Sequence, residues 1–261
     1  MLDSLSPPRR RLLLAVVTAF ATLAVVAGVL VATHSASGTD PAAQDEQGPV
    51  LVLPGYGGSV LSLNPLVAEL KREGRDVVVV RPTGGGTGDL RAQANRLGDA
   101  AKRALERTGA TSVDVVGYSA GGVIARLWVR DSGGDAVARR VLTLGSPHHG
   151  TDIAALAAEV GGTCTRACEE LGPESDLLRA LNAGDETPAG PVWITIRSTD
   201  DQIVTPTDSA MLDGALNLLI QDICPSAKTQ HTGLPGDPVV LAALPYVLGT
   251  EPPRAPRGVN C

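Results

Sequence analysis

The sequence predicts an α/β protein whose core is a parallel β-sheet. From residue 50 onward, short apolar runs alternate with segments of helical periodicity, the pattern of a parallel sheet with crossover helices. A second observation is the stretch Gly117-Tyr118-Ser119-Ala120-Gly121, which stands between an apolar run at 113–116 and a helical pattern at 122–130. Strand, sharp turn and helix in that order place the Ser119 hydroxyl at the top of the sheet.

The elements on either side of this turn are expected from their residues. The helix at 89–107, for example, has apolar residues near a 3.6-residue period, and Gly74 is expected to end the helix before it. Before the turn we expect, in chain order, a strand at 50–53, a loop at 54–58, a helix at 64–73, a strand at 76–80, a glycine-rich loop at 83–88 and the helix at 89–107. After it we expect strands at 140–144, 191–196 and 215–220 and a last helix at 238–247.

Residues 151–190 interrupt the alternation. They contain a short apolar segment at 153–160, two closely spaced cysteines and a second helical piece at 174–182. Two interpretations stay open: a crossover helix with a stapled loop, or a small cap over the site.

The N-terminal region is expected to be a targeting segment. Residues 12–32 are apolar and uncharged, and as a helix they would span roughly 30 Å, enough to cross a bilayer. The arginines at 9–11 predict a cytoplasmic N-terminus for such an anchor. A cleaved signal peptide, or a twin-arginine signal, is the alternative. We therefore divide the chain into an anchor or signal at 1–32, a flexible stalk at 33–48 and one domain at 49–261, which lies outside the cytoplasm.

Composition narrows the possible partners. The formal net charge is −6 and aromatic residues make up 2% of the chain, which argues against a nucleic-acid partner. All four cysteines fall in the exported part, where disulfides form. We expect the pairs Cys164–Cys168 and Cys224–Cys261; a zinc site is the alternative, although no cysteine has a histidine at ligand spacing.

The serine turn predicts a catalytic nucleophile. Glycines on both sides allow the strand and the helix to approach closely, and free N–H groups of the helix start can stabilise an oxyanion. A glycine-rich turn with a serine helix cap is the plainer interpretation. A nucleophilic serine also needs a base and an orienting carboxylate. Two neighbouring aspartates, Asp200 and Asp201, follow the strand expected at 191–196, and the sequence has four histidines.

Several motifs together resemble the compact bacterial lipases and esterases of the α/β-hydrolase fold, which have a minimal six-stranded sheet with helices on both faces. The resemblance covers most of residues 49–247. It rests on five motifs: Pro54-Gly55-Tyr56-Gly57-Gly58, the serine turn, Gly145-Ser146-Pro147-His148-His149-Gly150, Asp201-Gln202-Ile203-Val204 and His231-Thr232-Gly233-Leu234.

The resemblance implies roles for particular residues. The acid and the histidine follow the serine in that order, which excludes His34, His148 and His149 and leaves His231 as the base. In such lipases the acid stands three residues before a valine, which favours Asp201 over Asp200. The amides of Tyr56 and Ala120 would form the oxyanion hole, although Pro54 replaces the usual histidine.

The sequence thus predicts a serine ester hydrolase that acts on acyl esters or lipids through Ser119, His231 and Asp201, without metal or organic cofactor. An acyltransferase or thioesterase with the same triad is one alternative. A catalytically idle binding module on the same fold is the other. His148 and His149 are expected in a loop beside the site.

Overall fold

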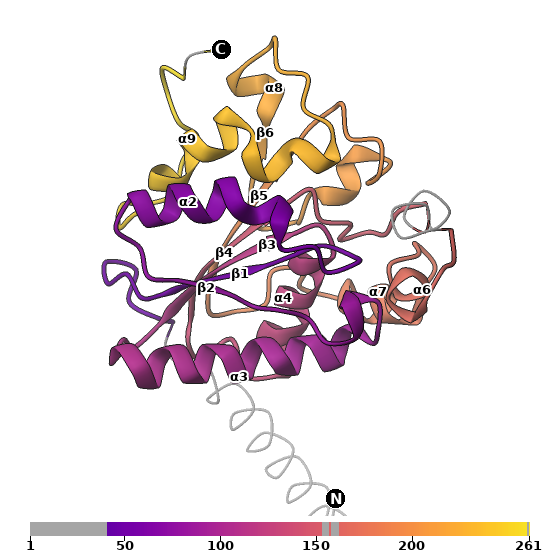
Figure 1. The fold of residues 1–261 in the computed structure, drawn as a ribbon, viewed down its shortest axis with the longest axis horizontal. Coiled ribbons are helices and arrows are strands. Elements are labelled where there is room, and N and C mark those ends of the chain that lie inside the picture. Colours follow the sequence, from indigo (N-terminus) through magenta and orange to yellow (C-terminus); the bar gives the residue numbers. More distant parts are fainter. Residues whose placement is uncertain (1–40, 153–156, 158–161, 260) are drawn as a thin grey trace, which may run out of the picture. The chain divides into compact units, whose positions relative to one another are not determined.

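The computed structural model describes residues 41–152, 157, 162–259 and 261 (Figure 1). The predicted anchor at 12–32 lies outside the described residues, and so do residues 33–40 of the predicted stalk. Within the described part of the chain, no helix has the length and apolar character needed to cross a membrane. The membrane anchor therefore stays a prediction from the sequence.

The core is a six-stranded sheet in which every neighbouring pair of strands is parallel. Its strand order is β2-β1-β3-β4-β5-β6. The strands are β1 (Val50–Leu53), β2 (Val77–Val79), β3 (Val113–Tyr118), β4 (Ala138–Leu144), β5 (Val192–Arg197) and β6 (Leu216–Leu219). The order reverses at β1, because the chain first moves outward to β2 and then returns to β3 on the other side. Parallel strands bring their carboxyl ends to one edge of the sheet, where ligands of open α/β sheets bind.

Helices cover both faces of the sheet (Figure 1). The α-helices are α2 (Asn64–Arg72), α3 (Leu90–Thr108), α4 (Ala120–Asp131), α6 (Arg166–Glu170), α7 (Asp176–Leu181), α8 (Ile220–Ile223) and α9 (Pro238–Val247). Four short 3₁₀ segments complete the described elements: η1 (Leu61–Leu63), η2 (Gly84–Gly86), η3 (Thr207–Ala210) and η4 (His231–Gly236). The fold class predicted from the sequence, a six-stranded parallel sheet between two helical layers, is confirmed.

Two hydrophobic cores follow from the two-residue period of the strands. In β1, Leu51 and Leu53 pack with α3 and α4, whereas Val50 and Val52 pack with α2 and α9. Side chains of successive strand residues point to opposite faces, so a strand between two layers is apolar throughout. The uniformly aliphatic run that predicted β1 is thus explained by burial on both faces.

Most observed boundaries lie within one or two residues of the prediction. The helix expected at 89–107 is α3, which starts one residue later, at Leu90. Asp89 is its N-cap, and the Asp89 side chain accepts hydrogen bonds from Arg91 N and Ala92 N. The strand expected at 215–220 ends at Leu219, where α8 begins without a loop. The apolar segment at 153–160 lies outside the described residues except for residue 157.

Residues 162–190 contain two short helices on the α4 side of the sheet. The piece expected at 174–182 is α7, capped by Ser175, and α6 was not predicted. Apolar residues of both helices belong to the same core as α3 and α4. Glu170 accepts a hydrogen bond from the amide of Leu90, which attaches α6 to the start of α3.

Arginine side chains fasten the C-terminal helix at the amino ends of the strands. Arg139 and Arg140 of β4 are fully buried and donate hydrogen bonds to the backbone carbonyls of Val247 and Leu248, at the end of α9. The buried Asp114 of β3 accepts from Arg139 at 2.5 Å. Burial and the neighbouring Arg139 lower the pKa of Arg140. These contacts give the last carbonyls of α9 charged donors in place of water.

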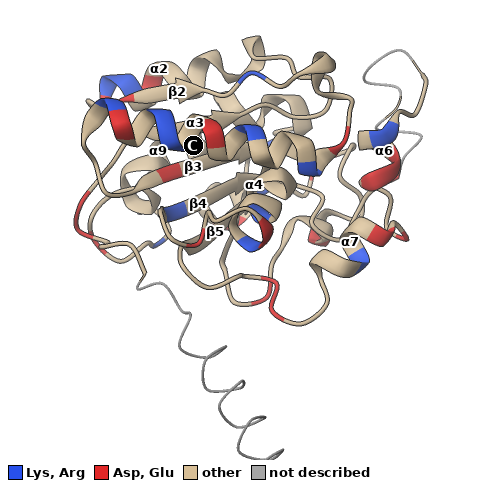
Figure 2. Ribbon diagram, turned by 90° about the horizontal axis from the view of Figure 1, so that it is seen from below, with Lys and Arg blue, Asp and Glu red and all other residues tan. Residues whose placement is uncertain are grey.

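Acidic and basic residues alternate on the exposed helix surfaces. Figure 2 shows both signs of charge on α2, α3, α6 and α7. Several form ion pairs one helical turn apart, such as Arg166 with Glu170 and Arg179 with Asp176. Such pairs contribute a few tenths of a kcal/mol each, so these faces are typical solvated helix surfaces.

Candidate active site

Ser119 occupies a strained turn between β3 and α4. Its backbone has φ 53° and ψ −123°, and it is the one non-glycine residue with positive φ in the described part of the chain. Such a conformation costs of order 1–3 kcal/mol and marks functional sites. Because Ser119 precedes the helix, its side chain stands at the carboxyl end of β3 rather than within either element.

The glycines around Ser119 are required by close backbone contacts. A Cβ at Gly117 would lie 2.5 Å from the amide nitrogen of Gly122, and one at Gly121 would lie 2.8 Å from the carbonyl oxygen of Leu53. Neither position has room for a side chain. The Gly-x-Ser-x-Gly spacing is therefore what allows β3 and α4 to meet at this angle.

Three residues far apart in the sequence form a hydrogen-bonded chain. His231 Nε2 lies 2.9 Å from Ser119 Oγ, and His231 Nδ1 lies 2.8 Å from Asp201 Oδ2. A carboxylate accepts only, so the proton belongs on Nδ1 and Nε2 accepts the serine hydroxyl. The exposed fractions of the three residues are 3% for Ser119, 4% for His231 and 5% for Asp201, so these hydrogen bonds are shielded from bulk water.

Asp201 and Asp200 have different surroundings. The second carboxylate oxygen of Asp201 accepts hydrogen bonds from Ile203 N at 2.9 Å and Val204 N at 2.8 Å. These two bonds fix the carboxylate so that its other oxygen faces His231. The Asp200 side chain is one-third exposed, and its nearest cation, Lys228 Nζ, is 3.9 Å away. The structure thus places Asp201, and not Asp200, against the histidine.

The absence of a side chain at Gly145 leaves room for the hydrogen bond between Asp201 and His231. A Cβ there would lie 2.5 Å from Leu234 Cδ1, 3.1 Å from Asp201 Oδ2 and 3.3 Å from His231 Nδ1. With φ +52°, Gly145 ends β4 in a conformation that side chains rarely adopt. The glycine after β4 is therefore part of the site's construction.

The segment that carries His231 is attached to the sheet through side chains. Tyr118 Oη donates to the backbone carbonyl of His231 at 3.2 Å, and the two rings lie 5.1 Å apart. Gln221 of α8 donates to Ser198 Oγ at 3.0 Å and to the carbonyl of Ala227 at 3.4 Å. Gln221 thereby links the turn that holds Asp201 to the loop that leads to His231.

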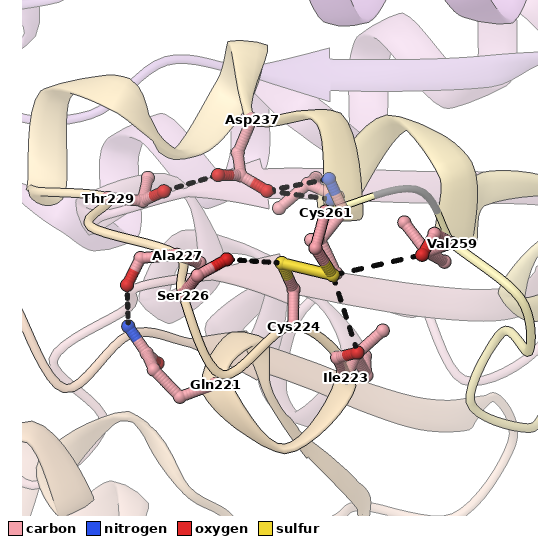
Figure 3. Close-up of a disulfide and its surroundings, with 11 residues drawn as sticks. Gln221, Ile223, Cys224, Ser226, Ala227, Thr229, Asp237, Val259 and Cys261 are labelled. Carbon is pink, nitrogen blue, oxygen red and sulfur yellow. Dashed lines mark hydrogen bonds between the residues drawn. A yellow bond between two sulfur atoms is a disulfide. The ribbon is translucent and has the colours of Figure 1, made fainter.

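A disulfide anchors the start of the same loop. Cys224, the residue after α8, is bonded to Cys261 (Figure 3). Farther along, Asp237 accepts a hydrogen bond from Thr229 Oγ1 and caps α9 through the amide of Val239. The loop is thus held on both sides of His231.

The predicted cysteine pairing is confirmed. The structure contains the Cys164–Cys168 and Cys224–Cys261 bridges, and all four cysteines are consumed in them. The zinc alternative therefore has no free thiol to use. Structural disulfides are consistent with a location outside the cytoplasm.

A cavity of about 230 Å³ opens in front of Ser119. His231, Tyr118 and Tyr56 border it, together with Gly55, whose Cβ would lie 2.9 Å from Ser119 Cβ. Ala120 is the first residue of α4, so its N–H belongs to the group at a helix start that lacks an intrahelical acceptor. Tyr56 thus borders the cavity from the loop after β1, and Ala120 follows Ser119 at the start of α4.

His148 and His149 follow β4 and differ in their surroundings. His148 is completely buried, with Nε2 3.1 Å from Thr143 Oγ1. Burial, and to a lesser degree the charge of Arg126, lower the pKa of His148 well below its usual value. His149 pairs with Glu186 at 2.7 Å on the outside. Both lie in the loop after β4, as expected from their sequence position.

Arg126 connects α4 to the segment after α7. Its buried guanidinium donates to Asn182 Oδ1 at 2.8 Å and to the carbonyl of Glu186 at 3.0 Å. Burial lowers the pKa of Arg126 to about 10, so it remains charged at neutral pH. The helix that follows Ser119 is thereby held to the chain segment next to His149.

Tyr118, Gln221 and Thr165 were not singled out from the sequence. Thr165 Oγ1, which donates its proton to the carbonyl of Thr87, accepts a 2.9 Å hydrogen bond from Tyr56 Oη, and this bond connects the loop after β1 to the Cys164–Cys168 loop. Tyr118 had a signal in the sequence, since it immediately precedes Ser119 in the Gly-x-Ser-x-Gly turn. Gln221 and Thr165 act on segments distant along the chain, and no local pattern marks them.

Comparison with known proteins identifies the fold. A model of the alpha/beta hydrolase fold matches residues 48–159. Lipase B of Aspergillus fumigatus has a similar structure, with a TM-score of 0.70 and 22% identity over 79% of this chain and 54% of that one. The mature form of lipase BlEst2 from Bacillus licheniformis has a TM-score of 0.65 and 18% identity, over 77% of this chain and 92% of that one. The lin2722 gene product of Listeria innocua has a TM-score of 0.56 and 17% identity, over 78% and 94%.

The chain therefore has the alpha/beta hydrolase fold. It spans about half the length of the Aspergillus lipase. No curated protein sequence matches it. Two of these structural neighbours are lipases, but at such identities the likeness establishes the fold, and an activity has to be argued from the site.

Proposed function

We propose that the protein is a serine ester hydrolase. The observation that carries this proposal is the chain of hydrogen bonds from Ser119 through His231 to Asp201, at the carboxyl edge of the sheet. Nucleophile, base and orienting acid stand in the relation that acyl transfer requires. The lipases among the structural neighbours support a hydrolase over other chemistries of this fold.

The reaction then proceeds in two halves. Ser119 Oγ attacks the ester carbonyl carbon while His231 Nε2 takes the hydroxyl proton, and the amides of Tyr56 and Ala120 donate to the resulting oxyanion. When the carbon–oxygen bond to the alcohol breaks, His231 returns the proton to the leaving alcohol. Water then attacks the carbonyl carbon of the acyl-enzyme while His231 takes its proton. As the carbon–oxygen bond to Ser119 breaks and the acid leaves, His231 returns that proton to Ser119 Oγ. Asp201 holds the ring and stabilises the imidazolium in both halves.

We also propose that this reaction takes place outside the cytoplasm, on a domain tethered by residues 12–32. The two disulfides support the compartment. The tether rests on the sequence, where an uncharged apolar run follows three arginines.

Active-site labelling combined with two single variants and the double variant tests the catalytic proposal. Ser119→Ala should lose about 10⁶ of kcat, and adding His231→Ala should cost almost nothing more, because the residues act as a unit. A fluorescent phosphonate should label wild type at Ser119 and neither single variant. Asp200→Asn, which leaves the histidine's partner in place, is the matched control and should label as wild type does.

The outcomes also separate the alternatives. Faster acyl transfer to an added alcohol or thiol than to water would make the protein an acyltransferase. Faster cleavage of thioesters than of oxygen esters would make it a thioesterase. A wild type that neither labels nor hydrolyses any ester would be an idle binding module, and the proposal would fall.

A further inference from the structure

The cavity in front of Ser119 is small. Its volume of about 230 Å³ is below the roughly 300–1,000 Å³ of pockets that enclose drug-sized ligands. A cavity of this size matches an ester group with an acyl chain of a few carbons rather than a long alkyl chain.

The walls of the cavity are rich in hydroxyl groups. Tyr56, Ser59, Ser62 and Thr232 contribute hydroxyls, and Ile203 contributes an aliphatic side chain. Tyr56 Oη is hydrogen-bonded to Thr165 Oγ1, and Ser62 Oγ donates to the carbonyl of Ser59, so these two hydroxyls need no partner from the substrate. The limit on the acyl chain therefore comes from the size of the cavity and from the positions of Tyr56 and Ile203 at its border.

Two of the bordering residues are held in place. Tyr56 Oη is hydrogen-bonded to Thr165 Oγ1 at 2.9 Å, and Thr165 Oγ1 in turn donates to the carbonyl of Thr87 at 2.8 Å. Ile203 is fixed through its backbone, since its N–H donates to Asp201 Oδ1 and its carbonyl accepts from Thr151 Oγ1. Enlarging the cavity by moving either residue would break these bonds.

We propose that the substrates of Ser119 are soluble esters with short acyl chains, from acetyl to about butyryl, and that long-chain lipids are excluded. This inference rests on the proposed function, because it concerns the same serine. It adds that the small cavity, bounded by Tyr56 and Ile203, sets the length limit.

A series of p-nitrophenyl esters measures the limit directly. For the full-length protein, kcat/KM should be highest for acetate to butyrate and should fall by at least about tenfold at octanoate, since a single misfitting methylene already costs about tenfold. The rate of tributyrin hydrolysis should reach its maximum at concentrations below the solubility limit of tributyrin. It should not rise further when droplets form. Alkyl phosphonates of the same lengths should label Ser119 in the same order, which gives a readout independent of turnover.

Replacing one wall residue should move the limit. Ile203→Ala keeps the amide that Asp201 needs and removes three carbons from the wall, so the ratio of kcat/KM for octanoate to butyrate should rise about tenfold. Gln202→Ala, at the exposed neighbouring position, is the matched control and should leave the ratio unchanged. Ile203→Val is a milder variant that should shift the ratio in the same direction.

Different failures have different meanings. Wild-type preference for octanoate or palmitate, with Ser119 required, would overturn the short-chain inference and leave the ester hydrolase standing. A sharp rise in rate at the tributyrin droplet surface would do the same, and so would an unchanged ratio in both Ile203 variants. If no ester is hydrolysed and no phosphonate labels Ser119, the proposed function falls and the inference falls with it.

Discussion

Replacing Asp201 by asparagine should abolish most catalysis while the fold survives, and the reason lies in the orientation that the side chain must adopt. One oxygen of Asp201 accepts the amides of Ile203 and Val204. In Asp201→Asn only the amide oxygen can keep those two bonds, so the NH₂ group must face His231 Nδ1. A donor there forces Nδ1 to be the acceptor, which puts the ring proton on Nε2. His231 then points a proton at Ser119 and cannot take one from it.

The magnitude follows from the wrong tautomer. Loss of the correct tautomer in a serine triad costs about 10⁴ in kcat, or about 5.5 kcal/mol in the activation barrier. Because both backbone bonds are kept, the free energy of unfolding should change by less than about 1 kcal/mol. Steady-state hydrolysis of p-nitrophenyl butyrate and urea denaturation measure the two quantities. Asp200→Asn should cost less than about tenfold, since that side chain faces Lys228. Equal losses in the two variants, or a larger loss at Asp200, would refute the assignment.

Three further outcomes are expected. In the loop-entropy model, Cys224→Ser should lower the free energy of unfolding by about 4 kcal/mol and Cys164→Ser by about 2 kcal/mol, because the closed loops span 37 and 4 residues; equal losses in denaturant titrations would contradict this. Burial lowers the pKa of His148 well below 6.5, so below that pH the unfolded chain binds a proton that the folded chain refuses. The free energy of unfolding should then fall by about 1.4 kcal/mol for each unit by which the pH decreases below 6.5. His148→Gln should flatten this slope; an unchanged slope would exclude His148 as its source. Finally, the full-length protein should sediment with membranes and a variant without residues 12–32 should not; release of a processed wild type into the medium would indicate a cleaved signal instead.

The parts of the fold that were predictable are those in which the signal is local. A run of aliphatic residues predicted β1, because both faces of that strand are buried. The helical period of α3 is likewise visible within its own residues. Ser119 was recognisable because steric crowding at the turn requires glycine on both sides. By contrast, α6 was missed: it has five residues, fewer than two helical turns, and the hydrogen bonds that attach it to Thr87 and to the start of α3 join segments distant in the sequence.

The rest of the candidate site depends on contacts between distant segments. The choice of Asp201 over Asp200 needed the resemblance, because both aspartates follow β5 and only the tertiary structure shows which one faces the histidine. Gln221 could not be found from the sequence at all. Its role arises because β6 runs directly into α8, which places a glutamine between two loops that meet only in the folded protein.

Ser119 and Asp201 differ from His231 in what holds them. Ser119 is the residue after β3 and Asp201 lies four residues after the end of β5, so sheet pairing positions both. His231 follows no strand. Its segment is held by the hydroxyl of Tyr118, by Gln221, by the disulfide at Cys224 and by α9, whose far end is fastened by buried arginines of β4. Changes in the C-terminal part of the chain should therefore reach catalysis through the position of the histidine, while the serine turn keeps its geometry.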